Sequence, residues 1–474
     1  MTSAVVLGGG MAGMLSAAVL ADHADNVTII ESDLFPAAPE LRKGLPQGYH
    51  NHMFMSGGVS AVDSLLPGTS DALYAAGAKR RGMPADLLTL SAEGWYRRHR
   101  DGRSHVLLCS RALLDHTLRE RVLANPKINV IEAAKVTGLA GTAARVTGVR
   151  VESAGSEPQT LDADFVVDAT GRRSKAPAWL AEFGLPDVEE ELVDAGFAYA
   201  SRLYEAPPGT PESFPGVLIQ AQNGTGKPGR GAALLPNEGN RWIVALIGTR
   251  GGQPPTDEAG FTEFARSLRD PAVADLMAAA TPAGRIQAYR GLPNWRRHYE
   301  KLPLPEGFVV IGDAATTLNP NYATGMSLAA LGAIALRDEL ARTGLVPGLA
   351  QKAQAGIAKA SLGAWQMATG TDQWFPDVKS TVKRAPDLLR RFTARFARMT
   401  TENAALSDAS FKTAALEAPP SSMMTLPALI TVFRGPRARP LSRQEAIAQY
   451  PEFGDLLNPR SSGDDTGDNT AQAA

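Results

Sequence analysis

The sequence contains almost no cysteine and almost no net charge. Its single cysteine, Cys109, excludes an internal disulfide and a zinc site made of several thiolates, so we expect a reducing compartment. The 48 Lys and Arg residues are balanced by 49 Asp and Glu residues, which leaves a net charge of −1. Because long-range attraction to a polyanion needs positive charge, this balance argues against a protein that binds nucleic acid or anionic membranes.

Long apolar runs and a targeting signal are also missing. Residues 1–21 carry no charged side chain, but they lack the basic start of a signal peptide. The uncharged residues 314–336 are interrupted by Asn319, Pro320 and Asn321 and do not supply the roughly 20 mainly apolar residues of a spanning helix. We therefore expect a cytoplasmic protein without a transmembrane segment.

Glycine is in excess. The 46 glycines among 474 residues amount to about 10%, above the roughly 7% of average proteins. Glycine and proline together reach only about 17%, which is too little for a low-complexity chain, and 44% of the residues are hydrophobic. The composition therefore indicates a globular protein of two or three domains, in which the glycines have particular positions.

The first glycines form a dinucleotide-binding pattern. The segment from Gly8 to Gly13 reads G-G-G-M-A-G, between a predicted strand at Ala4–Leu7 and a predicted helix at Met11–Ala21. In G-x-G-x-x-G, Gly8 permits a tight turn, Gly10 lets the backbone approach a pyrophosphate, and Gly13 lets the helix lie close to the strand. The motif predicts a Rossmann-like β-α-β unit.

The residues around this turn complete the pattern. Phosphates would bind to free N–H groups at the start of the helix, at Met11 and Ala12. A second strand at Val27–Ile30 ends at Glu31, 18 residues after Gly13, where an acid accepts hydrogen bonds from an adenosine ribose. We therefore assign Gly8, Gly10, Met11, Ala12, Gly13 and Glu31 to the cofactor site.

A second candidate segment lies some 300 residues later and points to a flavin. A buried strand at Phe308–Ile311 leads into Gly312-Asp313, and the loop that follows starts an apolar helix at about Ser327. Asp313 can bind a polyol hydroxyl, and a helix N-terminus can face an electron-rich ring edge. Since a flavin has both a ribitol chain and such a ring, we expect FAD.

These motifs resemble those of the single-component FAD monooxygenases with the para-hydroxybenzoate hydroxylase fold. More closely, the chain resembles bacterial squalene-epoxidase-like enzymes that epoxidise polyenes in polyether antibiotic biosynthesis. The resemblance covers about Ala4 to Leu340. Besides the two motifs above, it rests on Val166–Arg172, Arg42–Gln47 with His50 and His52, Cys109–Asp115, Arg241–Val244, Gly248–Gly252, Asn319–Pro320 and Gly325–Ser327.

The resemblance implies roles for further residues. Asp313 would hold the ribitol, Arg111 the pyrophosphate region, and Arg42 with Lys43 the adenosine side. A flavin-positioning loop would lie along the isoalloxazine; it includes Pro320, Tyr322, Ala323, Gly325, Met326 and Ser327. His50 and His52 are either contacts of the cofactor loop or ordinary loop residues, and no cluster of His, Cys and carboxylates has the spacing of a metal site.

One position departs from the family pattern. The epoxidases have Tyr followed by Gly-x-Gly, whereas this chain has Tyr322-Ala323-Thr324-Gly325. If the backbone at Ala323 has a positive φ, the added Cβ is unfavourable and can reshape the face where oxygen reacts. The departure leaves FAD binding untouched, but it permits a different reaction.

The resemblance implies a monooxygenase that transfers one oxygen atom from a flavin C4a-hydroperoxide to an apolar natural product, specifically by epoxidation of a polyketide alkene. Because the cofactor supplies this chemistry, no catalytic triad is required. Without a second nicotinamide-binding motif, electrons from NAD(P)H are expected through a separate flavin reductase, with O₂ as co-substrate. The alternatives are an FAD-containing cyclase with a non-redox reaction and a flavin-dependent alkene reductase; a Trp-x-Trp-x-Ile halogenase motif is missing.

The predicted fold class is α/β, with three parts. A discontinuous Rossmann-like FAD-binding domain takes residues 1–75, 106–185 and 286–345, and a mostly antiparallel substrate domain takes residues 76–105 and 186–285. A helical region, 346–460, and a disordered tail, 461–474, complete the chain. Phe197, Tyr199 and Trp242 are candidates for the substrate pocket, although ordinary sheet core explains each of them as well.

Overall fold

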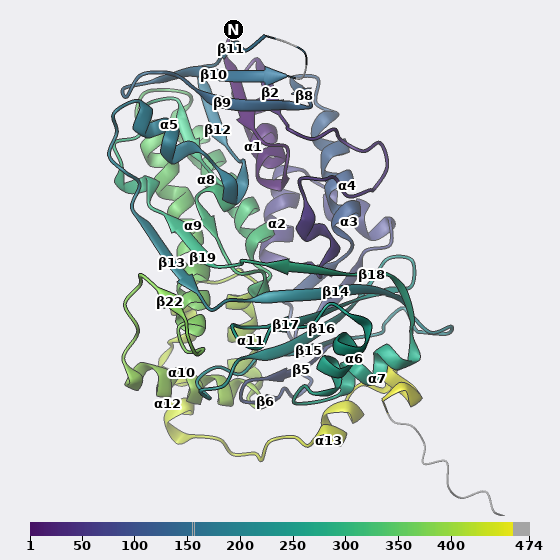
Figure 1. The fold of residues 1–474 in the computed structure, drawn as a ribbon. Coiled ribbons are helices and arrows are strands. Elements are labelled where there is room, and N and C mark those ends of the chain that lie inside the picture. Colours follow the sequence, from purple (N-terminus) through teal and green to yellow (C-terminus); the bar gives the residue numbers. More distant parts are fainter. Residues whose placement is uncertain (154, 156, 458–474) are drawn as a thin grey trace, which may run out of the picture.

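The computed structural model describes residues 1–153, 155 and 157–457, and its upper part in Figure 1 contains a five-stranded parallel sheet. The predicted tail at 461–474 lies outside the described residues. The strand order reverses beside β1, and ligands bind at such switch points in open α/β sheets. The strands follow the order β20 (Phe308–Val310), β12 (Phe165–Asp168), β1 (Ser3–Leu7), β2 (Asn26–Ile30) and β8 (Ile128–Ile131).

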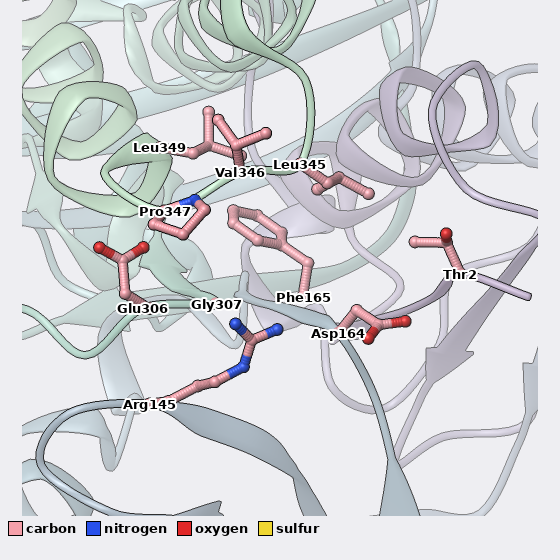
Figure 2. Close-up of a pocket in the computed structure, with 10 residues that line it drawn as sticks. All are labelled: Thr2, Arg145, Asp164, Phe165, Glu306, Gly307, Leu345, Val346, Pro347 and Leu349. Atoms are coloured by element: carbon pink, nitrogen blue, oxygen red, sulfur yellow. The ribbon is translucent and has the colours of Figure 1, made fainter.

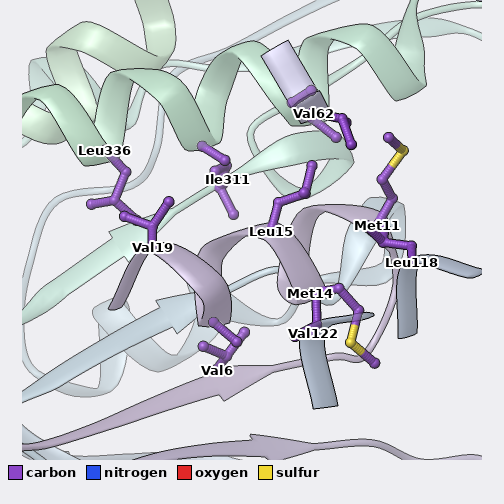
Figure 3. Close-up of a cluster of buried hydrophobic side chains, with 14 of the residues drawn as sticks. Val6, Met11, Met14, Leu15, Val19, Val62, Leu118, Val122, Ile311 and Leu336 are labelled. Atoms are coloured by element: carbon purple, nitrogen blue, oxygen red, sulfur yellow. The ribbon is translucent and has the colours of Figure 1, made fainter. Parts of the chain in front are cut away.

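Alternate side chains of these strands pack into two cores, one on each face of the sheet. On one face, Val6 packs with α1 (Met11–Ala21), and Figure 3 shows α1 between the sheet and neighbouring helices. Those helices are α2 (Ser56–Leu65), α4 (Arg111–Leu123) and α8 (Gly325–Thr343). On the other face, Val5 and Leu7 pack against an antiparallel sheet of β9 (Ala134–Gly141), β10 (Val146–Ser153) and β11 (Gln159–Asp162), and near α5 (Ala176–Glu182).

Local signals in the sequence explain where helices α1 and α4 begin. Helix α1 begins at Met11 and ends at Ala21, as predicted. Helix α4 is capped by Ser110, whose Oγ accepts a hydrogen bond from the Leu113 N–H at 3.2 Å. Such a cap satisfies one of the free N–H groups of the first turn. The predicted α/β class is confirmed.

A seven-stranded sheet forms the lower part of the molecule (Figure 1). All its pairs are antiparallel except β15 with β5. Helices α6 (Glu258–Arg266) and α7 (Ala272–Ala279) cover one face, together with α13 (Arg443–Ala448). The order is β18 (Thr281–Arg290), β14 (Ala198–Glu205), β17 (Arg241–Gly248), β16 (Arg230–Asn237), β15 (Gly216–Ile219), β5 (Leu87–Ser91) and β6 (Gly94–Trp95).

Two small sheets and several helices connect the two larger sheets. One small sheet contains β3 (Met53–Met55), β7 (His105–Leu108) and β4 (Lys79–Gly82); the other contains β21 (Thr316–Thr317), β19 (Asn294–Arg297), β13 (Glu190–Asp194) and β22 (Lys379–Ser380). Helix α9 (Leu349–Asp372) packs along α8, whereas α13 belongs to the core of the seven-stranded sheet. The remaining helices are α3 (Thr69–Ala75), α10 (Asp387–Thr400), α11 (Ala404–Ala414) and α12 (Leu426–Arg434).

Two of the expected domain limits do not coincide with the sheets. The limit between residues 285 and 286 falls inside β18, which continues across it beside β14. Strand β4, expected in the substrate domain, pairs with β7 instead of joining the seven-stranded sheet. These limits depend on pairing between strands that are far apart in the sequence, and this pairing cannot be predicted from local composition.

The close packing of α1 leads to a stability prediction. A Cβ on Gly13 would lie 1.8 Å from the Gly8 carbonyl oxygen, whereas a Cβ on Gly370 in α9 would meet nothing within 4 Å. We expect Gly13→Ala to lower the free energy of unfolding by about 1–3 kcal/mol or more through overpacking. The control Gly370→Ala should raise it by up to about 1 kcal/mol, because alanine favours a helix. Denaturant unfolding measures both, and equal stability of the two variants would contradict the packing argument.

Candidate functional site

Four loops from distant parts of the sequence meet at the carboxyl edge of the five-stranded sheet. Gly8 follows β1, Glu31 follows β2, Gly171 lies just after β12, and Gly312 follows β20. A Cβ added at Gly8 would lie 2.8 Å from the Ala169 carbonyl oxygen, and one at Gly312 would lie 2.9 Å from Ala12 Cβ. The structure therefore brings the two predicted motifs into contact at the switch point.

The glycine turn has the geometry of an anion site. Gly8 adopts φ +94°, a conformation that disfavours other residues, and Gly10 caps α1 with extended backbone and no side-chain hydrogen bond. The space in front of Gly10 is open, since a Cβ there would meet only Arg42 Nη2, at 3.8 Å. The Met11 side chain lies in the core (Figure 3), so this residue can contact a ligand only through its backbone. The N–H groups of Met11 and Ala12, in the first turn of α1, are available to bind an anion.

Glu31 is held in a buried polar cluster. It accepts a hydrogen bond from the Gly9 N–H at 2.7 Å and pairs with Arg42 Nη1 at 2.5 Å, while Arg42 Nη2 donates to the Gly9 carbonyl at 3.0 Å. Burial alone would raise the pKa of Glu31, but Arg42 and the N–H groups of Asp33 and Gly9 outweigh it and lower that pKa. Arg42 thus lies beside the predicted adenosine side, and Lys43 is exposed.

Asp313 lies within electrostatic range of two arginines, Arg172 and Arg111. Its side chain remains accessible, yet the surrounding protein displaces enough water to raise its pKa, despite the opposing charges of Arg172 and Arg111. The Arg111 Nε donates to Asp115 Oδ1 at 2.6 Å, which fixes the buried guanidinium in place. The site therefore provides one carboxylate, which can bind a polyol hydroxyl, and two nearby cations, which can bind a diphosphate.

The flavin-positioning loop is unusually shaped. A single helical turn at Pro320–Tyr322 ends at Ala323, which adopts the left-handed conformation with φ +52°. The Cβ position of Gly325, the first residue of α8, lies 3.9 Å from Asp313 Oδ1. The start of α8 and the Gly312-Asp313 turn are therefore neighbours, as an extended ligand bound by both would require.

Several buried polar atoms around this loop have no hydrogen-bond partner within the described residues. They are Asn319 Nδ2, Thr324 Oγ1, Ser327 Oγ and His50 Nε2. Buried polar groups in folded proteins are usually satisfied, so a group of orphaned atoms calls for an explanation. A bound molecule with hydrogen-bonding atoms that reaches this loop would satisfy them.

His50 connects the loop before β3 to the seven-stranded sheet. Its Nδ1 lies 2.7 Å from Ser201 Oγ on β14, and its ring stacks on Tyr289 of β18 at 5.4 Å. Burial lowers the pKa of His50 to about 4, so the imidazole is neutral at physiological pH. His52 lies nearby, and burial together with Arg111 lowers its pKa to about 3.

The three predicted pocket residues divide between the two faces of the sheet. The Tyr199 hydroxyl donates to Asn319 Oδ1 at 2.9 Å, and Phe197 packs edge-on against Phe375 at 5.5 Å. Trp242 is wrongly placed by the sequence-based interpretation: it stacks on Phe214 at 4.7 Å in the core beneath α6 and α7. The strand alternation was visible in the sequence, but the face that the helices cover was not.

Sequence reasoning assigned no role to two residues of this region. Arg172 ends the Val166–Arg172 motif, to which the resemblance assigns no role, and the structure places its charge near Asp313. Asp372 lies at the end of α9, where its Oδ1 accepts a hydrogen bond from Tyr322 Oη at 2.5 Å. A lone acid in a segment without a motif carries no local signal.

A cavity of about 160 Å³ lies at the opposite edge of the sheet (Figure 2). It lies near the amino ends of β12 and β20, and its acids are already engaged: Asp164 accepts from the Ser3 N–H and Glu306 from the Gly348 N–H. It takes no part in the candidate site. Among the described residues, no group of His, Cys, Asp and Glu could hold a metal ion, and no helix is long and apolar enough to cross a membrane.

Comparisons with known sequences point to one family. The model of the FAD binding domain family matches residues 1–345. Protein Rv3254 of Mycobacterium tuberculosis is 32% identical over 382 residues, which make up 77% of this chain and 78% of that protein. The 6-methylpretetramide 4-monooxygenase of Streptomyces rimosus is 27% identical over 359 residues, 72% of this chain and 75% of that protein.

Solved structures share the fold at low sequence identity. The flavin-dependent brominase Bmp2 has a TM-score of 0.65 at 15% identity, covering 91% of this chain and all of that one. The p-nitrophenol 4-monooxygenase of Pseudomonas putida has a TM-score of 0.61 at 16% identity, with 88% and 99% covered. The Diels-Alderase PyrE3 of pyrroindomycin biosynthesis has 0.60 at 17%, with 88% and 80% covered. The fold alone therefore does not choose between these reactions.

The position of Asp313 leads to a binding prediction. Asp313→Ala removes the carboxylate beside the start of α8, so FAD should bind at least about tenfold more weakly, as expected for a lost hydrogen bond to a charged group. The ratio of flavin to purified protein and a titration of the apoprotein measure this loss. The exposed Asp187 provides a control, Asp187→Ala, which should keep full occupancy. Stoichiometric FAD in Asp313→Ala would show that the assignment is wrong.

Buried His50 leads to a pH prediction. Unfolded His50 takes up a proton below about pH 6.5, whereas folded His50 does so only near pH 4. The free energy of unfolding should therefore fall as the pH drops from 6.5 to 4, by about 3 kcal/mol from this group. In urea unfolding, His50→Asn should reduce this fall by about that amount, while buried His52 continues to contribute to it. Parallel curves for wild type and His50→Asn would refute the prediction.

Proposed function

The chain belongs to the FAD-binding domain family of FAD-dependent monooxygenases, and on this premise we propose that it transfers one oxygen atom to an apolar natural product in the cytoplasm. The reaction that we propose in particular is the epoxidation of a polyketide alkene in secondary metabolism. The observation that carries the proposal is the meeting of four cofactor loops at the switch point, beside a loop with orphaned buried polar atoms.

The residues of the site fit FAD. The N-terminus of α1 would hold the diphosphate, the carboxylate of Glu31 the adenosine ribose, and that of Asp313 the ribitol. The loop Pro320–Tyr322 and the start of α8 would hold the isoalloxazine. When bound, the reduced flavin activates O₂, and the protein supplies orientation and excludes water.

The conformation of Ala323 is compatible with an oxygenase as well as with a non-redox cyclase. Ala323 adopts the left-handed conformation with positive φ in which glycine is more favourable than alanine. Its Cβ packs against an apolar cluster that includes Met55, Leu87 and Leu235. The cluster gives the methyl group packing partners, so an alanine is compatible with this loop conformation.

The substrate would lie between this loop and the adjacent face of the seven-stranded sheet. Phe197 and Tyr199 on that face belong to an apolar cluster, and neutral His50 presents its free Nε2 to a polar group of the substrate. The Streptomyces rimosus relative is named for a monooxygenase reaction, which supports oxygen transfer to an organic substrate. The proposed electron source is NAD(P)H, through a separate flavin reductase.

Isotope labelling tests this proposal. The FAD-loaded protein, a flavin reductase and NADH are supplied with a panel of linear polyenes under ¹⁸O₂. The proposal predicts an epoxide that is heavier than the product formed under ordinary O₂ by the mass difference of one oxygen isotope. The control omits the reductant and should give no product. A cyclised product of unchanged mass, formed equally well without reductant, would contradict the oxygenase and identify a cyclase.

A further inference from the structure

A buried carboxyl group lies behind the flavin-positioning loop. Asp372, at the end of α9, is 1% exposed. Its Oδ1 accepts a hydrogen bond from Tyr322 Oη at 2.5 Å, and its Oδ2 accepts one from Asn294 Nδ2 at 2.7 Å. Asp372 therefore contacts the loop directly at Tyr322 and belongs to neither the fingerprint nor the Gly312-Asp313 motif.

The hydrogen bonds continue from Asn294 into the loop. The Asn294 Oδ1 accepts from the Asn319 N–H at 2.8 Å. The Asn319 Oδ1 accepts in turn from the Asn321 N–H at 3.0 Å and from Tyr199 Oη at 2.9 Å. The beginning, middle and end of the single turn before Ala323 are thus tied to one network, which ends at the Asp372 carboxyl group.

Asp372 makes no ion pair within the described part of the chain. The titratable groups that face it are the phenols of Tyr322 and Tyr199 and, further away, the carboxylate of Asp194, which is paired with Arg250 at 2.8 Å. A buried carboxyl group without a cation is unfavourable, and such groups gather at functional sites.

We propose that Asp372 is a positioning residue for the flavin, because its charge state determines how firmly the network holds the loop from Asn319 to Gly325. The inference rests on the proposed placement of the flavin along this loop. It adds to that proposal a residue outside the known motifs and a dependence of FAD affinity on pH.

The direction of the effect follows from the donors. An ionised Asp372 accepts from both Tyr322 and Asn294, and such charge-assisted bonds are roughly twice as strong as neutral ones. A protonated Asp372 carries a hydrogen on one of its two oxygens, so either the Tyr322 hydroxyl gives up its donor role or Asn294 Nδ2 loses its acceptor. The loop is therefore held more firmly above the pKa of Asp372 than below it.

The network titrates near neutral pH. Burial raises the pKa of Asp372 to about 7, although the Tyr322 and Asn294 donors oppose this shift. Burial and Asp372 raise the pKa of both Tyr199 and Tyr322 well above their ordinary value, so both phenols stay protonated. Asp372 is thus the member of the network that changes charge in the physiological range.

A titration of the apoprotein with FAD, followed by flavin fluorescence from about pH 5.5 to 8.5, tests the proposal. Wild type should bind FAD about tenfold more tightly at about pH 8.5 than at about pH 5.5, because the hydrogen bonds gain charge assistance. The midpoint of this change in affinity should lie near pH 7. Asp372→Asn should bind with the weaker affinity and lose the pH step. Tyr322→Phe keeps the aromatic ring and should also lose the step.

A control variant and two kinds of negative result separate this proposal from the proposed function. Asp387→Asn removes an exposed carboxylate at the start of α10 and should keep the wild-type profile. If Asp372→Asn does not fold, as judged by circular dichroism, Tyr322→Phe decides the question. A pH step that persists in the folded variants, or a wild type that binds FAD equally well at every pH, overturns this proposal alone. A wild type that binds no FAD overturns the proposed function as well.

Discussion

The arrangement of the candidate site depends on the close approach of the first turn of α1 to the ends of β1 and β20. At Gly13 the helix lies so near the Gly8 carbonyl that a Cβ has no room, and a Cβ on Gly312 would lie 2.9 Å from Ala12 Cβ. Backbone contacts of this kind do not tolerate side chains, because protein interiors are packed as densely as crystals. They set how far the N-terminus of α1 lies from the Gly312-Asp313 turn.

Two buried hydrogen bonds join this site to the seven-stranded sheet. His50 bonds to Ser201, and Tyr199 bonds to Asn319, so the sheet supports both the loop before β3 and the flavin-positioning loop. Hydrogen bonds are stronger away from water, and their loss leaves unsatisfied groups. The sheet is therefore more than a wall of the proposed substrate site, since it also holds the loops that would position the cofactor.

Much of the central sheet and of the cofactor loops could be predicted from the sequence. Local sequence explains the limits of α1, the Ser110 cap and the turn at Gly8. At each of these places, a few neighbouring residues favour the same backbone conformation. Trp242 shows where this reasoning ends. Alternation along β17 separates its two faces, but whether α6 and α7 or the flavin loops cover the Trp242 face depends on helices that begin more than ten residues later.

The sequence by itself determined the β-α-β unit, the glycines that it needs, the acid at Glu31 and the Gly312-Asp313 turn, because each depends on local backbone geometry. The tertiary structure decided which side chains from distant segments meet there. It brought Asp372 of α9 to Tyr322, placed Arg172 near Asp313, and left Ala323 in a left-handed conformation that a neighbouring apolar cluster accommodates. Such pairings arise only when the whole chain packs, since the free energy that holds them comes from burial shared among many segments.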